Sequence, residues 1–414
     1  MSPDVPADQP VHAPAAANPR LRQLLVAIAA RTAIVGIIGQ GYVGLPLALA
    51  FVESGFRVTG FDLDPKKVEG LNAGESHIKH VGADRVAAAV ATGRCAATGD
   101  FSRLVECDAI VVCVPTPLGR HREPDMSYVR STTETIAQYL RAGQLVILES
   151  TTYPGTTDEE LQPVLEASGL TTPADFFLAF SPEREDPGNA SFNTKTIPKL
   201  VGGVNPESTE AAVALYTGSI AQVVPVSSSR VAESAKLLEN IYRAVNIDLV
   251  NELKMTFDRM DINIWEVIEA AKTKPFGFQA FYPGPGLGGH CIPLDPFYLT
   301  WKVAEYGMWT RFIELAGEIN TRMPSYEIIE LLQERGAEVS YCDPHIPVPH
   351  AGRKHDLPLT SVPLSAAEFA NYDAVVISTA HEAFKDPALY AGVRLLCDTR
   401  NCVVPPEGVR YVRA

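Results

Sequence analysis

The sequence predicts an α/β protein with two Rossmann-like, doubly wound parallel-sheet domains joined by a central helical region. Short β-rich runs alternate with helical stretches from Thr32 onward, which is typical of a parallel sheet covered by helices. Between Arg230 and about Arg322 the pattern changes to long helical periodicity. After that stretch a second, smaller α/β pattern begins.

The length of 414 residues is enough for two or three domains. We expect a disordered tail rich in Pro and Ala, a first sheet domain, a helical domain and a truncated second sheet domain. Their expected ranges are 1–30, 31–226, 227–324 and 325–414.

The first sheet is predicted from five apolar runs that are short enough to be buried strands. They are TAIVGIIG, RVTGFDLD, DAIVVCVPT, LVILESTT and FFLAFSPE. The second sheet is predicted from EVSYCDP, DAVVISTAH and VRLLCDTRN, which follow the helical run EIIELLQERG.

Composition excludes several classes of partner. A formal net charge of −14 leaves no basic excess for binding nucleic acid. The seven cysteines include no CxxC pair, so we expect no metal site. We also expect the protein to be located in the reducing cytoplasm. The apolar stretch Leu24–Val52 resembles a membrane span, but its four glycines and one proline favour a buried strand and helix.

A glycine-rich turn follows the first predicted strand. Gly39, Gly41 and Gly44 form GQGYVG, in which the glycines allow a tight turn, approach of a pyrophosphate and close helix packing. The next strand ends at Asp62, whose carboxylate would bind the ribose hydroxyls and repel a 2′-phosphate. The pattern favours NAD over NADP, and the alternative is a glycine turn without a ligand.

Hydroxyl side chains stand at the ends of two further strands. Thr116, Ser150 and Thr151 lie at the sheet edge where such folds bind ligands. They are equally compatible with helix capping.

Cys291 is the strongest candidate for a nucleophile. It stands in FYPGPGLGGHCIPLDP, a loop whose glycines admit a ligand closely. A free cysteine is more often a small buried hydrophobic residue. A thiolate could add to an aldehyde and pass through a thioester that water cleaves. Lys236 and Asn240, one helical turn apart, could stabilise the oxyanion, or they could form an ordinary solvated face.

These residues resemble the UDP-sugar 6-dehydrogenase family, most closely its UDP-N-acetylglucosamine branch. The resemblance spans nearly the whole chain from Thr32. Its matching segments are GQGYVGLPLA, VPTP, AFSPEREDPGN, TIPKLVGG, AESAKLLENIYRAVNIDLVNEL, FYPGPGLGGHCIPLDPFYLTWK, INTRMP, YCDP and DTRN.

The resemblance implies a role for each matching position. Cys291 would be the nucleophile, and Lys236 with Asn240 would hold the oxyanion. Asp295, aided by Thr116, would partner the catalytic water, and Glu183 would be an acid or base. The NAD site would comprise Gly39, Gly41, Tyr42, Val43, Gly44, Asp62, Lys67, Thr116, Ser150 and Thr151. The substrate would meet Glu183, Arg184, Lys236, Asn240, Tyr282, Gly284, Gly286, Gly288 and Arg400, the last at the UDP diphosphate.

The resemblance also implies a homodimer and synthesis of a surface polysaccharide precursor. Leu294 stands where the UDP-glucose branch commonly has lysine, which favours UDP-N-acetylglucosamine. Alternatives are oxidation of UDP-glucose or UDP-N-acetylmannosamine, an inactive nucleotide-binding remnant, and, least favoured, a hydroxyacid dehydrogenase with a histidine base.

The chain departs from the family pattern after INTRMP. Pro324 leads directly to SYEIIELLQERGAEV, the helix that should follow the first strand of the last domain. We therefore expect the C-terminal domain to lack that strand, which would lie in the middle of a doubly wound sheet, and its affinity for UDP to be reduced.

Overall fold

The computed structural model describes residues 18–79, 81–119, 123–184, 194–285, 292–321, 325–348 and 359–413. The chain forms two compact units. Unit 1 comprises Met1–Glu239 and Phe297–Gly307, and unit 2 comprises Asn240–Pro296 and Met308–Ala414.

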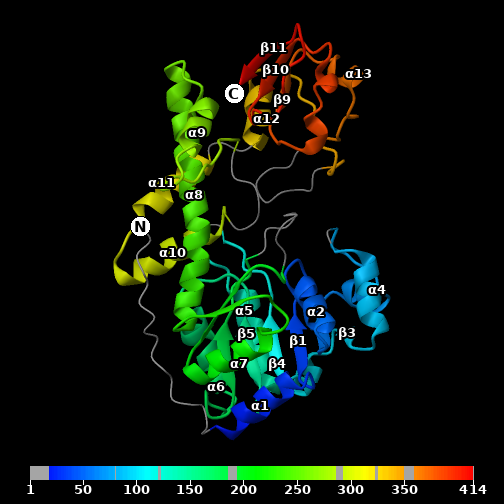
Figure 1. The fold of residues 1–414 in the computed structure, drawn as a ribbon, viewed down its shortest axis with the longest axis vertical. Helices are drawn as coiled ribbons and strands as arrows, with labels where there is room; N and C mark the ends of the chain where they lie inside the picture. Colours follow the sequence, from blue (N-terminus) through cyan, green and yellow to red (C-terminus); the bar gives the residue numbers. More distant parts are fainter. Residues whose placement is uncertain are drawn as a thin grey trace. The chain divides into compact units, whose positions relative to one another are not determined.

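Unit 1 contains an eight-stranded sheet with the order β3-β2-β1-β4-β5-β6-β7-β8 (Figure 1). The order of the first six strands confirms the doubly wound prediction, and all five expected strands are present. β7 runs antiparallel to β6. The strands are β1 (Ile34–Ile38), β2 (Arg57–Phe61), β3 (Cys95–Thr98), β4 (Ala109–Val112), β5 (Leu145–Leu148), β6 (Phe177–Phe180), β7 (Lys199–Gly203) and β8 (Val223–Pro225).

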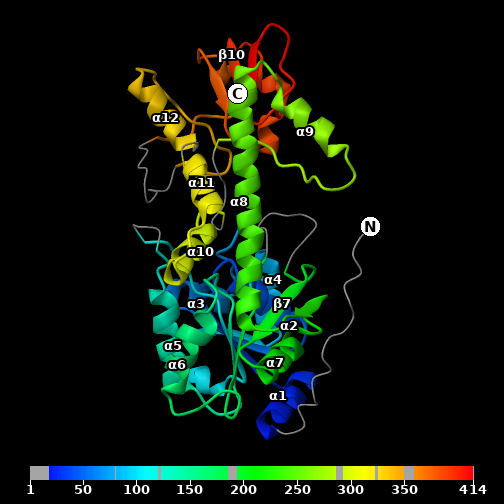
Figure 2. The ribbon, with the colours of Figure 1, turned by 90° about the vertical axis from the view of Figure 1, so that its left-hand side faces the viewer.

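Successive residues of each strand point to opposite faces of the sheet and pack into two hydrophobic cores, one on each face. Val111 and Ile147 belong to the core beneath the helices α1 (Pro19–Ala29), α2 (Gly44–Glu53) and α7 (Pro206–Tyr216). Val112 and Leu148 belong to the core beneath α5 (Ser127–Tyr139) and α6 (Gln162–Glu166), which lie together on the other side (Figure 2). Because both faces are covered, the strands read as continuous apolar runs.

The helices of unit 1 follow the strands in the expected alternation. They are α1 (Pro19–Ala29), α2 (Gly44–Glu53), α3 (Pro65–Asn72), α4 (Ala83–Ala91), α5 (Ser127–Tyr139), α6 (Gln162–Glu166) and α7 (Pro206–Tyr216), with the short helices η1 (Phe101–Glu106), η2 (Thr156–Leu161) and η3 (Ala304–Tyr306). η2 is a π-helix, a form that is uncommon and often lies near functional sites.

Helix α1 corrects the expected boundary of the disordered tail. The side chain of Asn18 accepts hydrogen bonds from the first helical N–H groups, and Pro19 occupies the first turn. Leu21, Leu24 and Ile28 are buried in the core with α7, and each such burial stabilises the helix by about 2 kcal/mol. Pro and Ala content predicts disorder for this segment, but Leu21, Leu24 and Ile28 have the three- and four-residue spacing of a buried helix face.

Helix α8 (Ser229–Arg259) is the long helix in Figure 1, and its residues belong to both units. Together with α9 (Ile264–Lys272), α10 (Asp295–Val303) and α11 (Arg311–Thr321) it confirms the predicted helical stretch. Among the residues described, no helix combines the length and the apolar character needed to cross a bilayer.

Unit 2 contains a separate three-stranded parallel sheet with the order β11-β10-β9. Its elements are α12 (Ser325–Glu334), α13 (Ala366–Phe369), β9 (Val375–Ile377), η4 (Glu382–Phe384), η5 (Pro387–Tyr390), β10 (Leu395–Asp398) and β11 (Arg410–Arg413). In the described chain no strand stands between α11 and α12, in line with the expected loss of the first strand.

The prediction of a strand at EVSYCDP is wrong. This segment is irregular, and its backbone bonds to a neighbouring loop instead of a sheet. The carbonyl of Tyr341 accepts the Val362 N–H at 2.9 Å, and the Asp343 N–H donates to Ser361 Oγ at 2.9 Å. These two bonds hold Tyr341 and Asp343 against the loop around Ser361, outside the three-stranded sheet.

Candidate active site

The glycine-rich turn lies at the carboxyl end of β1, between β1 and β4, where the strand order of the sheet reverses. Gly39 has φ +92°, and its N–H donates to Phe61 O at 2.8 Å. A Cβ added at Gly44 would overlap the carbonyl oxygen of Gly39. A Cβ added at Gly41 would meet nothing within 4 Å. The open space at Gly41 fits the close approach of a pyrophosphate.

Asp62 and Lys67, both expected at the NAD site, lie together. Lys67 Nζ is 3.4 Å from Asp62 Oδ2, which also accepts the Gln40 N–H at 3.0 Å. The Asp64 N–H binds the other carboxylate oxygen at 3.0 Å. These contacts fix the carboxylate at the end of β2, where a ribose would bind. Tyr42 is exposed and Val43 is the N-cap of α2.

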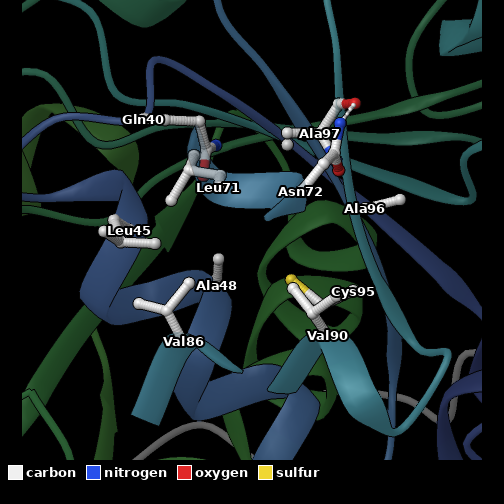
Figure 3. Close-up of a pocket in the computed structure, with 11 residues that line it drawn as sticks. Gln40, Leu45, Ala48, Leu71, Asn72, Val86, Val90, Cys95, Ala96 and Ala97 are labelled. Carbon is white, nitrogen blue, oxygen red and sulfur yellow. Dashed lines mark hydrogen bonds between the residues drawn. The ribbon is translucent and has the colours of Figure 1, made fainter. Parts of the chain in front are cut away.

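A small pocket lies beneath this turn, between β2, β3, α2 and α4 (Figure 3). Gln40, Leu45, Leu71 and Cys95 are among its lining residues. Its volume of about 10 Å³ holds at most one water molecule. The pocket is therefore a small packing defect in the core beneath α1, α2 and α7. It is too small to be a dinucleotide-binding site.

The hydroxyl residues after β4 and β5 bind the backbone around them. Thr116 Oγ1 donates to Thr151 O at 2.7 Å, and Ser150 Oγ donates to Val114 O at 2.7 Å. Tyr298 donates its phenol O–H to the carbonyl of Thr116. These bonds tie the two strand ends to each other and to α10.

Thr152 was not predicted and has an unusual environment. Its Oγ1 is buried, and within the described ranges no hydrogen-bond partner is present. A buried hydroxyl without a partner is uncommon. Thr152 therefore joins the candidates at this sheet edge.

Glu183 and Lys236 lie together in unit 1. Lys236, buried on α8, donates to the backbone carbonyl of Glu183. The Arg184 N–H binds Glu183 Oε1 at 2.7 Å. The guanidinium of Arg184 forms a two-bond ion pair with Glu239 at 2.5 and 3.1 Å. The SPER turn after β6 is thus held against the first turns of α8.

Asn240 and Asp295 lie together in unit 2. Asn240 Nδ2 donates to Asp295 Oδ2 at 2.5 Å, and both side chains are buried. The Asn240 side-chain carbonyl also accepts from Arg243. Asp295 follows Cys291 by four positions, so this bond ties the end of the cysteine loop to α8.

Three residues expected in the substrate loop, Gly286, Gly288 and Cys291, fall outside the described residues. The preceding Gly284 donates its N–H to Asn251 Oδ1 at 3.0 Å. Tyr282 stacks on Trp265, with ring centroids 5.9 Å apart, and binds Glu269 through its hydroxyl.

Arg400 lies against the beginning of the same loop. A Cβ added at Gly284 would overlap the guanidinium of Arg400. Asp398, fully buried, accepts the N–H groups of Arg400 and Val403 at 2.9 and 3.0 Å. Burial lowers the pKa of Arg400, although the group stays cationic. The DTRN turn therefore presents a partly desolvated cation beside the loop.

Sequence reasoning overlooked several buried charged residues. Glu149, Lys199 and Glu233 are nearly or completely buried in unit 1. Charged side chains inside apolar runs, such as the glutamate in LVILESTT, were the available signal. Their partners could not be inferred because they lie 50 to 78 positions away.

Family models match three consecutive parts of the chain. The NAD binding domain of the UDP-glucose/GDP-mannose dehydrogenase family matches residues 33–220, its central domain 230–322 and its UDP binding domain 321–405. The chain belongs to the UDP-glucose/GDP-mannose dehydrogenase family.

Named relatives agree with this assignment. A UDP-N-acetyl-D-glucosamine 6-dehydrogenase from Pseudomonas aeruginosa is 39% identical over 72% of this chain and 70% of its own length. One from Salmonella typhi is 31% identical over 85% of this chain and 90% of its own length. The structure of the UDP-N-acetyl-mannosamine dehydrogenase Cap5O from Staphylococcus aureus superimposes with a TM-score of 0.79 at 27% identity, covering 92% of this chain and 98% of that one.

Family membership confirms the predicted oxidoreductase class and NAD as the cofactor. The UDP binding domain supports a UDP-sugar as the substrate. Relatives with different sugars in their names match this chain, so the family assignment leaves the individual sugar open.

Proposed function

We propose that this chain oxidises the 6-hydroxymethyl group of UDP-N-acetylglucosamine to a carboxylate, supplying a uronic acid for surface polysaccharide synthesis. The glycine turn and Asp62 would hold NAD, which would supply the hydride acceptor for both oxidation steps. The remaining chemistry falls to side chains of this protein.

In the first step the C6 hydroxyl loses its proton to the Glu183 carboxylate while a C6–H bond breaks as hydride, giving an aldehyde. The thiolate of Cys291 adds to the aldehyde carbon, and the new C–S bond gives a thiohemiacetal. Loss of the second hydride gives a thioester. Water, losing a proton to Asp295, then forms a C–O bond as the C–S bond breaks, which releases the sugar carboxyl group and regenerates the Cys291 thiolate.

The oxyanions that form in these steps need donors. Lys236 and Asn240 stand four residues apart on α8, and we assign them this role. Asp295, with Thr116, would partner the attacking water. The observation that carries the proposal is the bond between Asn240 and Asp295, because it joins the helix of the oxyanion donors to the residue that closes the cysteine loop.

The test is NADH formation from UDP-N-acetylglucosamine. We expect two NADH per sugar from the intact chain and no uronic acid from Cys291→Ala. Cys95→Ala, on edge strand β3, is the matched control. It should still form two NADH per sugar and the uronic acid. A stoichiometry of one NADH with release of the aldehyde, or uronic acid formation by Cys291→Ala, would exclude the thioester route.

A second candidate substrate is UDP-N-acetylmannosamine. It is favoured by the likeness to Cap5O and by a relative of that name from Pyrococcus horikoshii that is 34% identical. Comparing kcat/KM for the two sugars and UDP-glucose decides between them. If none of the three yields NADH, the chain is a nucleotide-binding remnant.

We also propose that the chain acts as a homodimer in the cytoplasm. Large apolar side chains of unit 2 are exposed, among them Leu249, Met255, Phe312 and Leu315, and such surfaces mark interaction sites. The six cysteines in the described part of the chain are free thiols, which suits a reducing compartment. A monomer mass by light scattering would contradict the dimer.

A further inference from the structure

A buried polar chain lies beneath Glu183 at the carboxyl edge of β5 and β6. Lys199 Nζ lies 2.9 Å from Glu149 Oε2 and 3.8 Å from Glu183 Oε2. Tyr216 donates its hydroxyl to the other oxygen of Glu149. The side chains of Lys199 and Glu149 are 5% and 0% exposed, and that of Glu183 is 14% exposed. One ammonium therefore stands between two carboxylates, and the more accessible carboxylate is Glu183.

The charge states in this chain follow from burial and from the neighbours. Burial opposes the charge of Lys199, but Glu149 and Glu183 outweigh it and raise the lysine pKa above its ordinary value. Burial raises the pKa values of Tyr216 and Cys113 well above their ordinary ranges. Tyr216 therefore stays a hydrogen-bond donor, Cys113 stays a neutral thiol and Lys199 stays charged.

Other elements around Glu183 contribute different contacts. From α8, Lys236 binds the backbone carbonyl of Glu183 and Glu239 pairs with the guanidinium of Arg184. From its own turn, the Arg184 N–H binds Oε1. Lys199, from β7, places an ammonium near Oε2. The two carboxylate oxygens of Glu183 thus face donors of different kinds, a backbone N–H and a full positive charge.

We propose that Lys199, held in place by Glu149 and Tyr216, supplies the positive charge that faces the Glu183 carboxylate and orients it to accept the hydroxyl proton of the sugar. The inference rests on the proposed function, in which Glu183 is that base. Lys199 is a positioning residue, because it acts through Glu183 and keeps its own protons throughout. The negative charge of Glu149 offsets part of the positive charge of Lys199, and so weakens the electrostatic effect of Lys199 on Glu183.

The charge balance gives opposite expectations for two substitutions. In Lys199→Met the Glu183 carboxylate loses the ammonium 3.8 Å from its Oε2. Burial, which raises the pKa of Glu149, then opposes a negative charge on either carboxylate, so Glu183 should bind a proton at higher pH. The acid limb of the kcat/KM profile should move to higher pH by one unit or more, which lowers kcat/KM about tenfold on that limb. In Glu149→Gln the Lys199 ammonium has Glu183 as its remaining carboxylate neighbour in this cluster. The acid limb of the kcat/KM profile should therefore move to lower pH.

Two further variants control for packing. Lys199→Arg keeps the charge and should keep the acid limb close to its original pH. The double variant Lys199→Met with Glu149→Gln removes one charge of each sign, so its limb should lie between those of the two single variants. The KM for NAD should stay unchanged throughout. An unmoved limb in Lys199→Met, or a limb that depends on side-chain size and not on charge, would overturn the proposal.

The inference can fail separately from the proposed function. Loss of activity in Glu183→Gln is expected, and retained activity would remove Glu183 as the base. If the intact chain oxidises no UDP-sugar, the proposed function fails, and infrared titration of the Glu183 carboxyl still tests Lys199. That carboxyl is identified by subtracting the spectrum of Glu183→Gln. Should Lys199→Met not fold, the opposite shift in Glu149→Gln remains as the test, and its absence would refute the role.

Discussion

Glu233 connects α8 to the π-helix η2, and its carboxylate gives a quantitative prediction. It is fully buried and accepts the N–H of Gly155 at 2.7 Å, the N–H of Thr157 at 2.9 Å and the Thr157 hydroxyl at 2.6 Å. Burial raises its pKa from 4.5 to about 7, although these hydrogen bonds lower it. The group lies one helical turn before Lys236 on α8.

The sign of the pH effect follows from proton binding. Because the pKa in the folded protein exceeds that of the unfolded chain, the folded protein binds the proton more tightly. The stability contributed by this group is fully present below pH 4.5 and is lost as the pH rises through about 7. Between pH 5 and pH 8 the free energy of unfolding should fall by about 2.5 kcal/mol through Glu233 alone.

Glu233→Gln mimics the protonated acid and removes this dependence. Urea unfolding followed by circular dichroism at pH 5 and pH 8 gives the free energy of unfolding of each variant. The variant should gain about 2.5 kcal/mol relative to the original chain between these pH values. Glu210→Gln, an exposed carboxylate on α7, should show no such gain. A difference that is constant between pH 5 and pH 8 would refute the reasoning.

Three further predictions concern the ligand sites. Gly44→Ala should lower the melting temperature because its Cβ overlaps backbone, whereas Gly41→Ala should leave the melting temperature within a few degrees and abolish NAD binding in calorimetry; equal effects would contradict the assignment of the turn. Asp62→Asn should weaken NAD binding about tenfold or more through loss of a charged hydrogen bond to ribose, with NADP gaining relative to NAD; an unchanged NAD affinity would exclude Asp62. Gly284→Ala should displace Arg400 and weaken UDP binding as much as Arg400→Ala does, with NAD binding unchanged; full UDP affinity in both would remove this arginine from the site.

Local patterns in the sequence predicted five of the eight strands of unit 1. Apolar runs predicted these strands, and the spacing of Gly39, Gly41 and Gly44 predicted the dinucleotide turn in the connection from β1 to α2. These patterns do not predict β3, β7 or β8. The edge strand β3, CAAT, is short and half exposed. The segment EVSYCDP has the composition of a strand, but a strand also needs a neighbour to bond, and that neighbour is absent from the described chain.

The sequence predicted some residues of the candidate site and not others. Asn240 and Asp295 were assigned through the family resemblance, and the structure brings them within 2.5 Å. Lys236 donates to the backbone carbonyl of Glu183, and its role at the oxyanion stays a prediction. Lys199 was overlooked, since neither its burial nor its distance to Glu183 has a signature in the local sequence.

The sequence alone determined the alternation of strands and helices, the NAD-binding turn and the family, because each depends on residues that are neighbours along the chain. The tertiary structure decided which distant charges share a buried site. Lys199 begins β7, whereas Glu149 and Glu183 follow β5 and β6, and the energies of buried charges depend on distances that only folding sets.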